Sequence, residues 1–296
     1  MNPFDSFKER ILFLNKKIKD TREILLEQFL QMEEEEEYTK EVEEYKLEYA
    51  YISHIGKFRA GNEDNYAIGG NCLPQNHQSM KEVISRKELV SEVKAMAVFD
   101  GIGGAAHGEA ASYAAAKSFL KWTYYGLTKE KEIDYLVQRM NQDVCQADPD
   151  KDGNAMGTTM TSIFFNRDRV FFSNIGDSPS YLYRSEELVP VYCPHTNADF
   201  LKAMGLEHKK PKLTQYLGMN EENILLEPHI SSLKMKDNDI YLLCSDGLTD
   251  MVKEEDIKKT LSGCQNLKKT VEELLSYALN HGGKDNITIL LCRVYK

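Results

Sequence analysis

Hydrophobic and polar positions change their pattern along the chain near residue 47. From Leu47 onward, short runs rich in β-branched and aromatic residues alternate with turn residues, which predicts a series of short strands. The predicted strands are Glu48–His54, Ala95–Phe99, Thr158–Phe165, Val170–Ile175, Ser180–Tyr183, Asp239–Ser245 and Ile287–Tyr295. Stretches with helical spacing predict helices at about Gly108–Tyr125, Glu130–Gln146, Lys253–Ser262 and Leu267–Asn280.

The order of these elements limits the fold class. The predicted helices follow one another in consecutive pairs, one pair between Ala95–Phe99 and Thr158–Phe165 and the other before the last strand. A doubly wound parallel sheet would instead place a helix after every strand. The chain is therefore predicted to have an α+β fold, in which sheets pack together and helix pairs lie on the outside.

The first 46 residues carry a different pattern. Apolar residues recur there at alternating three- and four-residue steps, which predicts a charged helix with a heptad-like seam. The seam consists of Phe4, Phe7, Ile11, Leu14, Ile18, Leu25 and Met32. The acidic run Glu33–Glu37 follows it and is typical of a solvated face. This helical, acidic extension either packs on the rest of the chain or acts as an arm for a protein partner or for self-association.

Composition and charge exclude several classes of protein. The hydrophobic share of 42% with 10% aromatic residues is typical of a globular chain. A formal net charge of −10 argues against a binder of nucleic acid or anionic membranes. The six cysteines have no CxxC spacing, which indicates reduced thiols. No apolar run approaches the roughly 20 residues of a membrane span, so we expect a cytoplasmic protein.

Acidic residues stand at the ends of several predicted strands. They are Glu63, Asp64, Asp100, Asp246 and Asp285. Asp100 and Asp246 each follow an apolar strand and precede a glycine, which lets the backbone approach a ligand closely. Carboxylates that converge raise one another's pKa unless cations neutralise them. Oxygen-only ligands suit Mg²⁺ or Mn²⁺ rather than zinc, so the sequence indicates a site for such ions.

Six stretches around these acids carry a family resemblance. They are Ser53–Asp64, Val98–Gly104, Met156–Thr159, Asn174–Ser178, Ser245–Asp250 and Asp285–Thr288. In this order they resemble the motifs of the type 2C, metal-dependent serine/threonine protein phosphatases, especially the bacterial branch. The resemblance covers residues 47–296 and leaves residues 1–46 outside. It implies two packed antiparallel β-sheets flanked by helix pairs, a four-layer α-β-β-α sandwich.

The resemblance also implies a set of metal ligands. Asp100 would bridge two Mn²⁺ or Mg²⁺ ions, with the carbonyl of Gly101 and the carboxylate of Glu63 completing one side. Asp246 and Asp285 would hold the second ion. Such a pair of ions suits hydrolysis of a phosphoester by direct attack of a metal-bound hydroxide.

Further roles follow from the same resemblance. Asp64 would orient metal-bound waters, and Arg59 would contact the substrate phosphate through its planar guanidinium group. The implied activity is removal of phosphate from phosphoserine and phosphothreonine in proteins. No phosphoenzyme is required, so no cysteine or serine nucleophile is expected.

The chain departs from the family pattern at three places. Ile102 follows the first Asp-Gly where many eukaryotic members have histidine, so the general acid is unassigned. His107 lies nearby and is expected to be a surface or helix-start residue. Pro179 stands where the family often has arginine, which predicts a local structural change rather than loss of activity.

The segment His195–Ser232 is expected to form a short flap beside the active site. Its lysines are Lys202, Lys209, Lys210 and Lys212. They are interpreted as solvated side chains, with contact to an acidic phosphopeptide as the alternative.

The segment Asp148–Gly153 resembles the start of an EF-hand loop. The twelfth position is Thr159 instead of the bidentate glutamate that calcium requires, which argues against an EF-hand. Asp152 lies five residues before Gly157, where bacterial relatives of the family bind a third, weaker metal ion. We therefore predict that Asp152 contributes to such a site.

Other functions compete with the phosphatase hypothesis. A pseudophosphatase would bind phosphoproteins without turnover, but it would be expected to lack one or more of Glu63, Asp100, Asp246 and Asp285, and all are present. A calcium-regulated binding protein is disfavoured by Thr159. A small phosphoester as the substrate stays open, because these residues handle metal and phosphate and not the leaving group.

Overall fold

The computed structural model describes residues 44–102, 107–124, 126–127, 129–148, 156–206, 208–219 and 225–296. Nearly all of the predicted N-terminal extension lies outside these ranges. Asp152 also lies outside them. The first described strand begins at Lys46, one residue before the start expected for the main domain.

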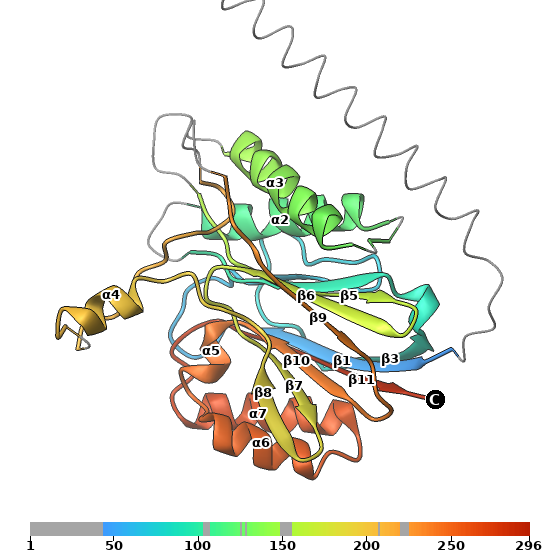
Figure 1. Ribbon diagram of the computed structural model, residues 1–296. Coiled ribbons are helices and arrows are strands. Elements are labelled where there is room, and N and C mark those ends of the chain that lie inside the picture. Colours follow the sequence, from blue (N-terminus) through green and yellow to red (C-terminus); the bar gives the residue numbers. More distant parts are fainter. Residues whose placement is uncertain are drawn as a thin grey trace, which may run out of the picture. The chain divides into compact units, whose positions relative to one another are not determined.

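Two antiparallel β-sheets form the centre of the described domain (Figure 1). The six-stranded sheet has the order β3 (Ile84–Leu89), β1 (Lys46–His54), β11 (Ile287–Tyr295), β10 (Ile240–Cys244), β7 (Ser180–Arg184) and β8 (Glu187–Pro190). The five-stranded sheet has the order β2 (Asn65–Ala67), β4 (Ala95–Phe99), β5 (Met160–Asn166), β6 (Arg169–Ile175) and β9 (His229–Lys234). Every neighbouring pair of strands is antiparallel.

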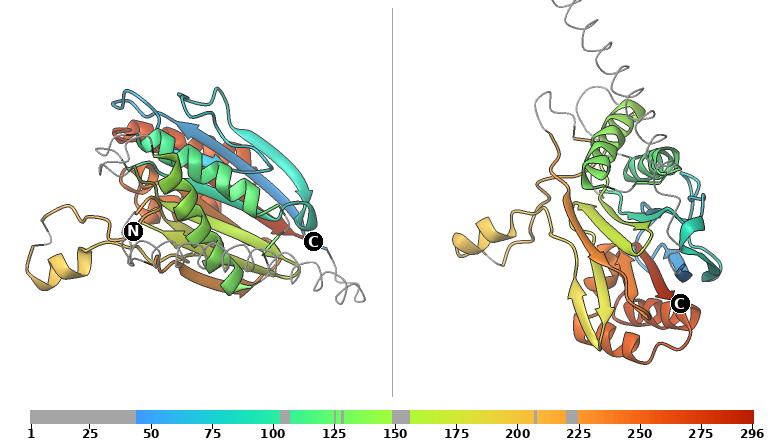
Figure 2. Two further views of the ribbon diagram at one scale, coloured as in Figure 1. Left: turned by 90° about the horizontal axis from the view of Figure 1, so that it is seen from above. Right: turned by 45° about the vertical axis from the view of Figure 1, so that its right-hand side comes forward.

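Helix pairs cover the outer faces of the two sheets. The pair α2 (Gly108–Trp122) and α3 (Glu130–Ala147) packs on the five-stranded sheet, and the pair α6 (Glu254–Ser262) and α7 (Leu267–Asn280) packs on the six-stranded sheet. Figure 2 shows the same layers from two further directions. The predicted α+β class, with two packed antiparallel sheets between helix pairs, is confirmed.

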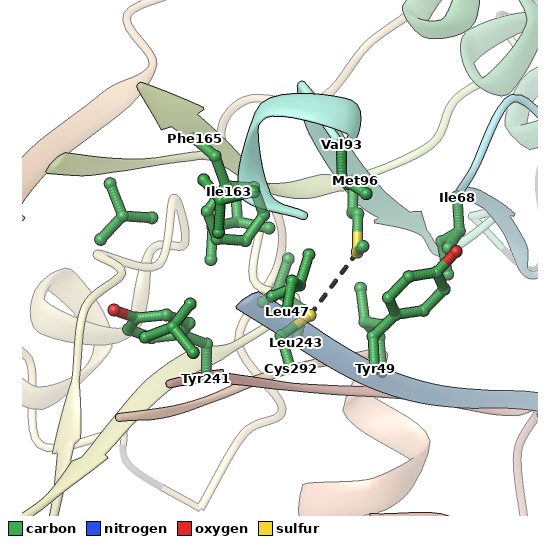
Figure 3. Close-up of a cluster of buried hydrophobic side chains, with 14 of the residues drawn as sticks. Leu47, Tyr49, Ile68, Val93, Met96, Ile163, Phe165, Tyr241, Leu243 and Cys292 are labelled. Atoms are coloured by element: carbon green, nitrogen blue, oxygen red, sulfur yellow. Dashed lines mark hydrogen bonds between the residues drawn. The ribbon is translucent and has the colours of Figure 1, made fainter. Parts of the chain in front are cut away.

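Alternation along the strands divides the core into layers. On β4, Met96 and Val98 point between the sheets, whereas Ala97 and Phe99 face the α2–α3 pair. Figure 3 shows the layer between the sheets, where Met96 lies 3.5 Å from Cys292 of β11, sulfur to sulfur. Because the side-chain period of a strand is two, one strand supplies both layers. Both sheets are therefore buried on two faces, which explains their long apolar runs.

The structure adds elements that the sequence pattern did not predict. The sequence pattern missed four strands, β2, β3, β8 and β9. It also missed the 3₁₀ helix Val90–Glu92 and the short helices α4 (Ala198–Ala203) and α5 (Asp246–Thr249). The flap expected at His195–Ser232 extends too far at its C-terminal end, because His229–Ser232 belongs to β9 and pairs with β6. The six cysteines are free thiols. Among the described helices, none has the length and apolar character needed to cross a membrane.

Candidate active site

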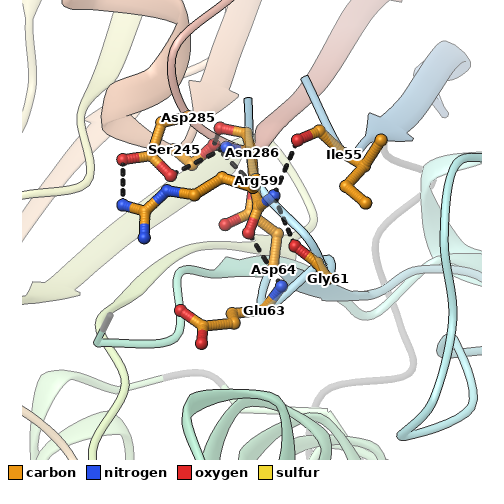
Figure 4. Close-up of polar contacts among 8 residues, drawn as sticks. All are labelled: Ile55, Arg59, Gly61, Glu63, Asp64, Ser245, Asp285 and Asn286. Atoms are coloured by element: carbon orange, nitrogen blue, oxygen red, sulfur yellow. Dashed lines mark hydrogen bonds and ion pairs between the residues drawn. The ribbon is translucent and has the colours of Figure 1, made fainter. Parts of the chain in front are cut away.

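The predicted site residues come from four segments that meet at one end of the two sheets. Glu63 and Asp64 lie in the connection between β1 and β2, and Asp100 follows the last residue of β4. Asp246 is the first residue of α5, directly after β10 and Ser245, and Asp285 lies just before β11. The two sheets thus bring together residues that lie far apart in the sequence (Figure 4).

Asn286 fastens the first of these segments to the start of β11. Its Oδ1 accepts a hydrogen bond of 2.8 Å from the backbone N–H of Glu63. Its Nδ2 donates to the carbonyls of Ile55 at 2.9 Å and Gly61 at 3.0 Å. With 4% of its surface exposed, Asn286 replaces water as the partner of all three backbone groups. It therefore sets the course of the loop that carries Arg59 and Glu63.

Asp64 is buried beneath this loop. The hydroxyls of Ser245 and Thr288 both donate to its Oδ2, each at 2.7 Å. Burial raises the pKa of Asp64 to about 7, and repulsion by Asp246 and Asp285 adds to the rise while the two hydroxyls oppose it. Burial thus disfavours the charged form of Asp64, and the two hydroxyls stabilise that form only in part.

The backbone around Asp100 is held by threonines and a glycine. Thr159 donates its N–H to the Asp100 carbonyl at 2.9 Å, and the Thr158 hydroxyl donates to the same oxygen at 2.8 Å. Gly101 donates its N–H to the carbonyl of Glu63 at 3.2 Å. A Cβ at Gly101 would lie 2.6 Å from that carbonyl oxygen, so only glycine allows this approach. The backbone that carries Asp100 is thereby held directly against the backbone of Glu63.

Asp246 occupies a similarly tight turn. A Cβ on the next residue, Gly247, would lie 1.9 Å from the carbonyl oxygen of Asn286, which only glycine tolerates. Burial raises the pKa of Asp246 to about 6, with repulsion from Asp250 and Asp177 as further causes. Positive charge on Lys210 acts in the opposite direction.

Arg59 lies at the exposed edge of the cluster and contacts Asp285. Its Nη2 lies 2.7 Å from Asp285 Oδ2. The Arg59 side chain is 42% exposed and that of Asp285 29%, so the pair remains open to solvent. Two residues predicted for different roles, phosphate contact and metal binding, therefore contact each other in this structure.

The electrostatics of the cluster are those of a site for cations. Burial raises the pKa of Asp100 well above its ordinary value, and Asp64 and Asp246 raise it further by repulsion. Burial also raises the pKa of Glu63. Across the described ranges, no three Asp, Glu, His or Cys side chains are already gathered as a ligand group. A half-buried set of oxygen donors, with excess negative charge and the close approach at Gly101, nevertheless fits Mg²⁺ or Mn²⁺.

Comparison with known families matches residues 86–288, more than half of the chain, to the family described as Protein phosphatase 2C. The chain belongs to the protein phosphatase 2C family. The serine/threonine phosphatase Stp of Listeria monocytogenes serovar 1/2a (strain ATCC BAA-679 / EGD-e) is 30% identical over 251 residues, which are 80% of this chain and 91% of that protein.

A second similar protein is longer than the present chain. The serine/threonine phosphatase PstP of Mycobacterium tuberculosis (strain ATCC 25618 / H37Rv) is 31% identical over 258 residues, 84% of this chain and 45% of that protein. The chain thus matches less than half of the length of that relative. The crystal structure of the PstP catalytic domain, solved in complex with two manganese ions, has a TM-score of 0.68 and 29% identity. The match covers 85% of this chain and all of that one.

Several residues that organise this 2C-family site were not predicted to do so. They are Asn286, Ser245, Thr288, Thr158 and Thr159. Each lies inside a stretch that carried the family resemblance. Their neutral side chains, however, gave no indication in the sequence that they would position the acids. Their partners lie far away in the chain: Thr288 and Asp64 are 224 positions apart.

The structure also locates His107 and Pro179, two residues that the sequence analysis singled out. His107 is the residue before α2, in the left-handed conformation with φ of 73°, which confirms the expected helix-start position. The buried Pro179 accepts a hydrogen bond of 3.1 Å from the N–H of Cys244 through its carbonyl. Asp152 lies outside the described residues, so its role stays a prediction.

Proposed function

We propose that this chain is a metal-dependent serine/threonine phosphoprotein phosphatase whose catalytic unit lies within residues 47–296. The observation that carries the proposal is that five acids from four segments, Glu63, Asp64, Asp100, Asp246 and Asp285, lie close enough for their charges to repel one another. The names of the similar proteins, serine/threonine phosphatases, support the same reaction. Family membership alone would not distinguish an enzyme from a binding protein, whereas a complete set of acids favours turnover.

The predicted metal ligands would form two groups, one for each of two ions. Asp100 would bridge two ions, with Glu63 and the Gly101 carbonyl on one side and Asp246 and Asp285 on the other. Two Mn²⁺ or Mg²⁺ ions held there would lower the pKa of coordinated water and stabilise the charge that develops in phosphoester hydrolysis. The related PstP domain with two manganese ions supports this stoichiometry.

Arg59 would bind the phosphate of the substrate. Its guanidinium presents two parallel N–H donors that match two phosphate oxygens. In the structure one of these groups contacts Asp285 at 2.7 Å. Asp285 would hold a cation in the loaded site, and the exposed Arg59 would then be available to the phosphate. This exchange would tie substrate binding to prior loading of the site.

Asp64 would orient water next to the reacting phosphate. Its Oδ2 accepts from both Ser245 and Thr288, so Oδ1 is the oxygen that would accept a hydrogen bond from water. The two hydroxyls hold the carboxylate in one orientation, which is what positioning of a water molecule requires. Loss of either hydroxyl would leave Asp64 in place but poorly aligned.

The test is hydrolysis of a phosphothreonine peptide with Mn²⁺, with Mg²⁺ and with a chelator, for the wild type and for Asp246→Asn. We expect turnover that needs metal and that falls by several orders of magnitude in the variant. Asp168→Asn is a matched control, because Asp168 pairs with Lys234 on the surface and is not part of the acidic cluster. A folded wild type without turnover under any metal would refute the proposal and leave the pseudophosphatase alternative.

A further inference from the structure

A hairpin-like segment extends from the domain beside the acidic cluster. We call residues 195–206 and 208–219, which carry α4, the flap segment. Figures 1 and 2 show α4 standing away from the sheets in all three views. The two arms of the flap segment are joined by backbone hydrogen bonds: Thr214 donates to His195 at 2.8 Å and Asn197 donates to Lys212 at 3.0 Å. The flap segment therefore has a stem whose two arms are paired.

The stem is fixed directly to the candidate active site. His195 donates its N–H to the Gly176 carbonyl at 3.0 Å, and the Gly176 N–H donates to His195 Nδ1 at 3.2 Å. On the other arm, Leu217 and Thr158 exchange two backbone hydrogen bonds of 2.9 and 3.0 Å. Thr158 in turn holds the carbonyl of Asp100. A polypeptide bound on the flap segment would consequently be presented to the acidic cluster at a defined place.

Two large apolar side chains are exposed on the last turns of α4, Phe200 within the helix and Met204 just after its end, where the Met204 N–H donates to the Phe200 carbonyl at 3.1 Å. Leu201 is buried at 8% exposure and anchors the helix, whereas Phe200 is 62% and Met204 61% exposed. Residues four positions apart lie on the same side of a helical turn. Large exposed apolar side chains that share one face are typical of interaction sites.

The flap segment also carries an excess of positive charge, although the protein as a whole is acidic. Residues 195–219 contain four lysines, all exposed, and two acids, Asp199 and Glu207, in a chain whose formal net charge is −10. The lysines are Lys202, Lys209, Lys210 and Lys212. Lys210 is close enough to the site for its charge to oppose the rise that burial causes in the pKa of Asp177 and of Asp246. Positive charge thus extends from the rim of the site along the flap segment.

We propose that the flap segment binds the substrate polypeptide next to its phosphorylated residue, and that it selects acidic segments that also carry a large apolar side chain. The inference rests on the phosphatase activity proposed above. Complementary charge would steer such a segment to the lysines. Phe200 and Met204 would then be covered by its apolar residue, and desolvated contacts of this kind supply most of the affinity in small interfaces.

The test uses two phosphothreonine peptides of equal length, one with glutamate and leucine neighbours and one with lysine and serine neighbours. The small substrate p-nitrophenyl phosphate reports the chemistry without a polypeptide. We expect the wild type to prefer the acidic peptide roughly tenfold in kcat/KM, mainly through KM, and to lose this preference at high salt. The wild-type comparison needs no variant, so it cannot be confounded by misfolding.

Two double variants separate the contributions. Lys202→Glu with Lys209→Glu should abolish the preference for acidic over basic neighbours, and Phe200→Ser with Met204→Ser should raise KM for the leucine-containing peptide. Lys210 is left unchanged because its charge reaches Asp246. Lys259→Glu on α6 is the matched control, since it reverses an exposed charge on the far helix pair and should keep the preference.

The outcomes distinguish this inference from the proposed function. If neither p-nitrophenyl phosphate nor either peptide is hydrolysed, the phosphatase proposal fails. If p-nitrophenyl phosphate is hydrolysed but the wild type treats both peptides alike, the phosphatase proposal stands and the flap inference is overturned. It is also overturned if Phe200→Ser with Met204→Ser changes only the oligomeric state in sedimentation, because a second copy of the chain would then be the occupant.

Discussion

Asn286 provides the sharpest test of how the site is built. Asn286→Ala removes the three hydrogen bonds that the side chain makes to Glu63, Ile55 and Gly61. At about 1 kcal/mol of net stability each, their loss should lower the free energy of unfolding by about 3 kcal/mol. For a domain of this size, that corresponds to a decrease in Tm of about 6–12 °C.

The same substitution should weaken metal binding. Without Asn286, the loop that carries Glu63 is no longer held against the start of β11, so one predicted ligand loses its fixed position. Asn174→Ala is the matched control, because its side chain also makes three hydrogen bonds, to Gly176 and twice to Cys193, and is also buried. Thermal unfolding with and without Mn²⁺, together with calorimetric titration of Mn²⁺, measures both effects.

The two variants should lose similar stability without metal and differ in affinity. We expect Asn286→Ala to bind Mn²⁺ at least about tenfold more weakly, which corresponds to about 1.4 kcal/mol, while Asn174→Ala binds as the wild type does. Equal Mn²⁺ affinity in Asn286→Ala and the wild type would refute the reasoning, because Glu63 would then need no support from Asn286 to reach the ion.

Three further predictions address charge, pH and packing. Arg59→Ala should raise KM for a phosphopeptide about tenfold or more without weakening Mn²⁺ binding, because Asp285 loses a competing cation; an unchanged KM in steady-state kinetics would exclude phosphate contact by Arg59. Asp100→Asn should raise the Tm of the metal-free protein at about pH 7.5 by several degrees more than at about pH 4, as measured by differential scanning fluorimetry with chelator. The sign follows because folding raises the pKa of Asp100, so its charge destabilises the fold only above the unfolded-state pKa, and increasingly as the pH rises toward the folded-state value. Equal Tm shifts at both pH values would contradict this. Met96→Ala, at a fully buried position between the sheets, should cost about 2–5 kcal/mol in urea denaturation while leaving Mn²⁺ affinity unchanged, and a smaller loss would mean that the layer collapses around the cavity.

The sequence by itself determined the layers of the fold. Long apolar runs such as Ile240–Cys244 and Ile287–Tyr295 predict buried strands because each side chain in them meets a hydrophobic layer. The consecutive helix pairs then allow few arrangements other than sheets enclosed by helices. The chemistry of the site was indicated for a similar reason: acids next to glycines at strand ends are visible along the chain, wherever their partners lie.

Elements at the edges of the fold could not be predicted in this way. β3 and β8 are outer strands of the six-stranded sheet, and β9 is an outer strand of the other. None of the residues in these three strands is fully buried, so alternation of apolar and polar residues is weak. Such strands form because a neighbouring strand offers free backbone groups, and the sequence of the edge strand itself carries little of that information.

Only the tertiary structure decided how the site is held. Ser245 and Thr288 reach Asp64 because β10 and β11 are neighbours in one sheet, and Asn286 reaches Glu63 across 223 positions of the chain. Hydroxyl and amide side chains are common throughout the sequence, and nothing local marks the few that meet a buried carboxylate or an unpaired backbone group. The charged residues of the site could therefore be proposed from the sequence, whereas the neutral residues that position them are chosen by strand pairing, which is a property of the whole fold.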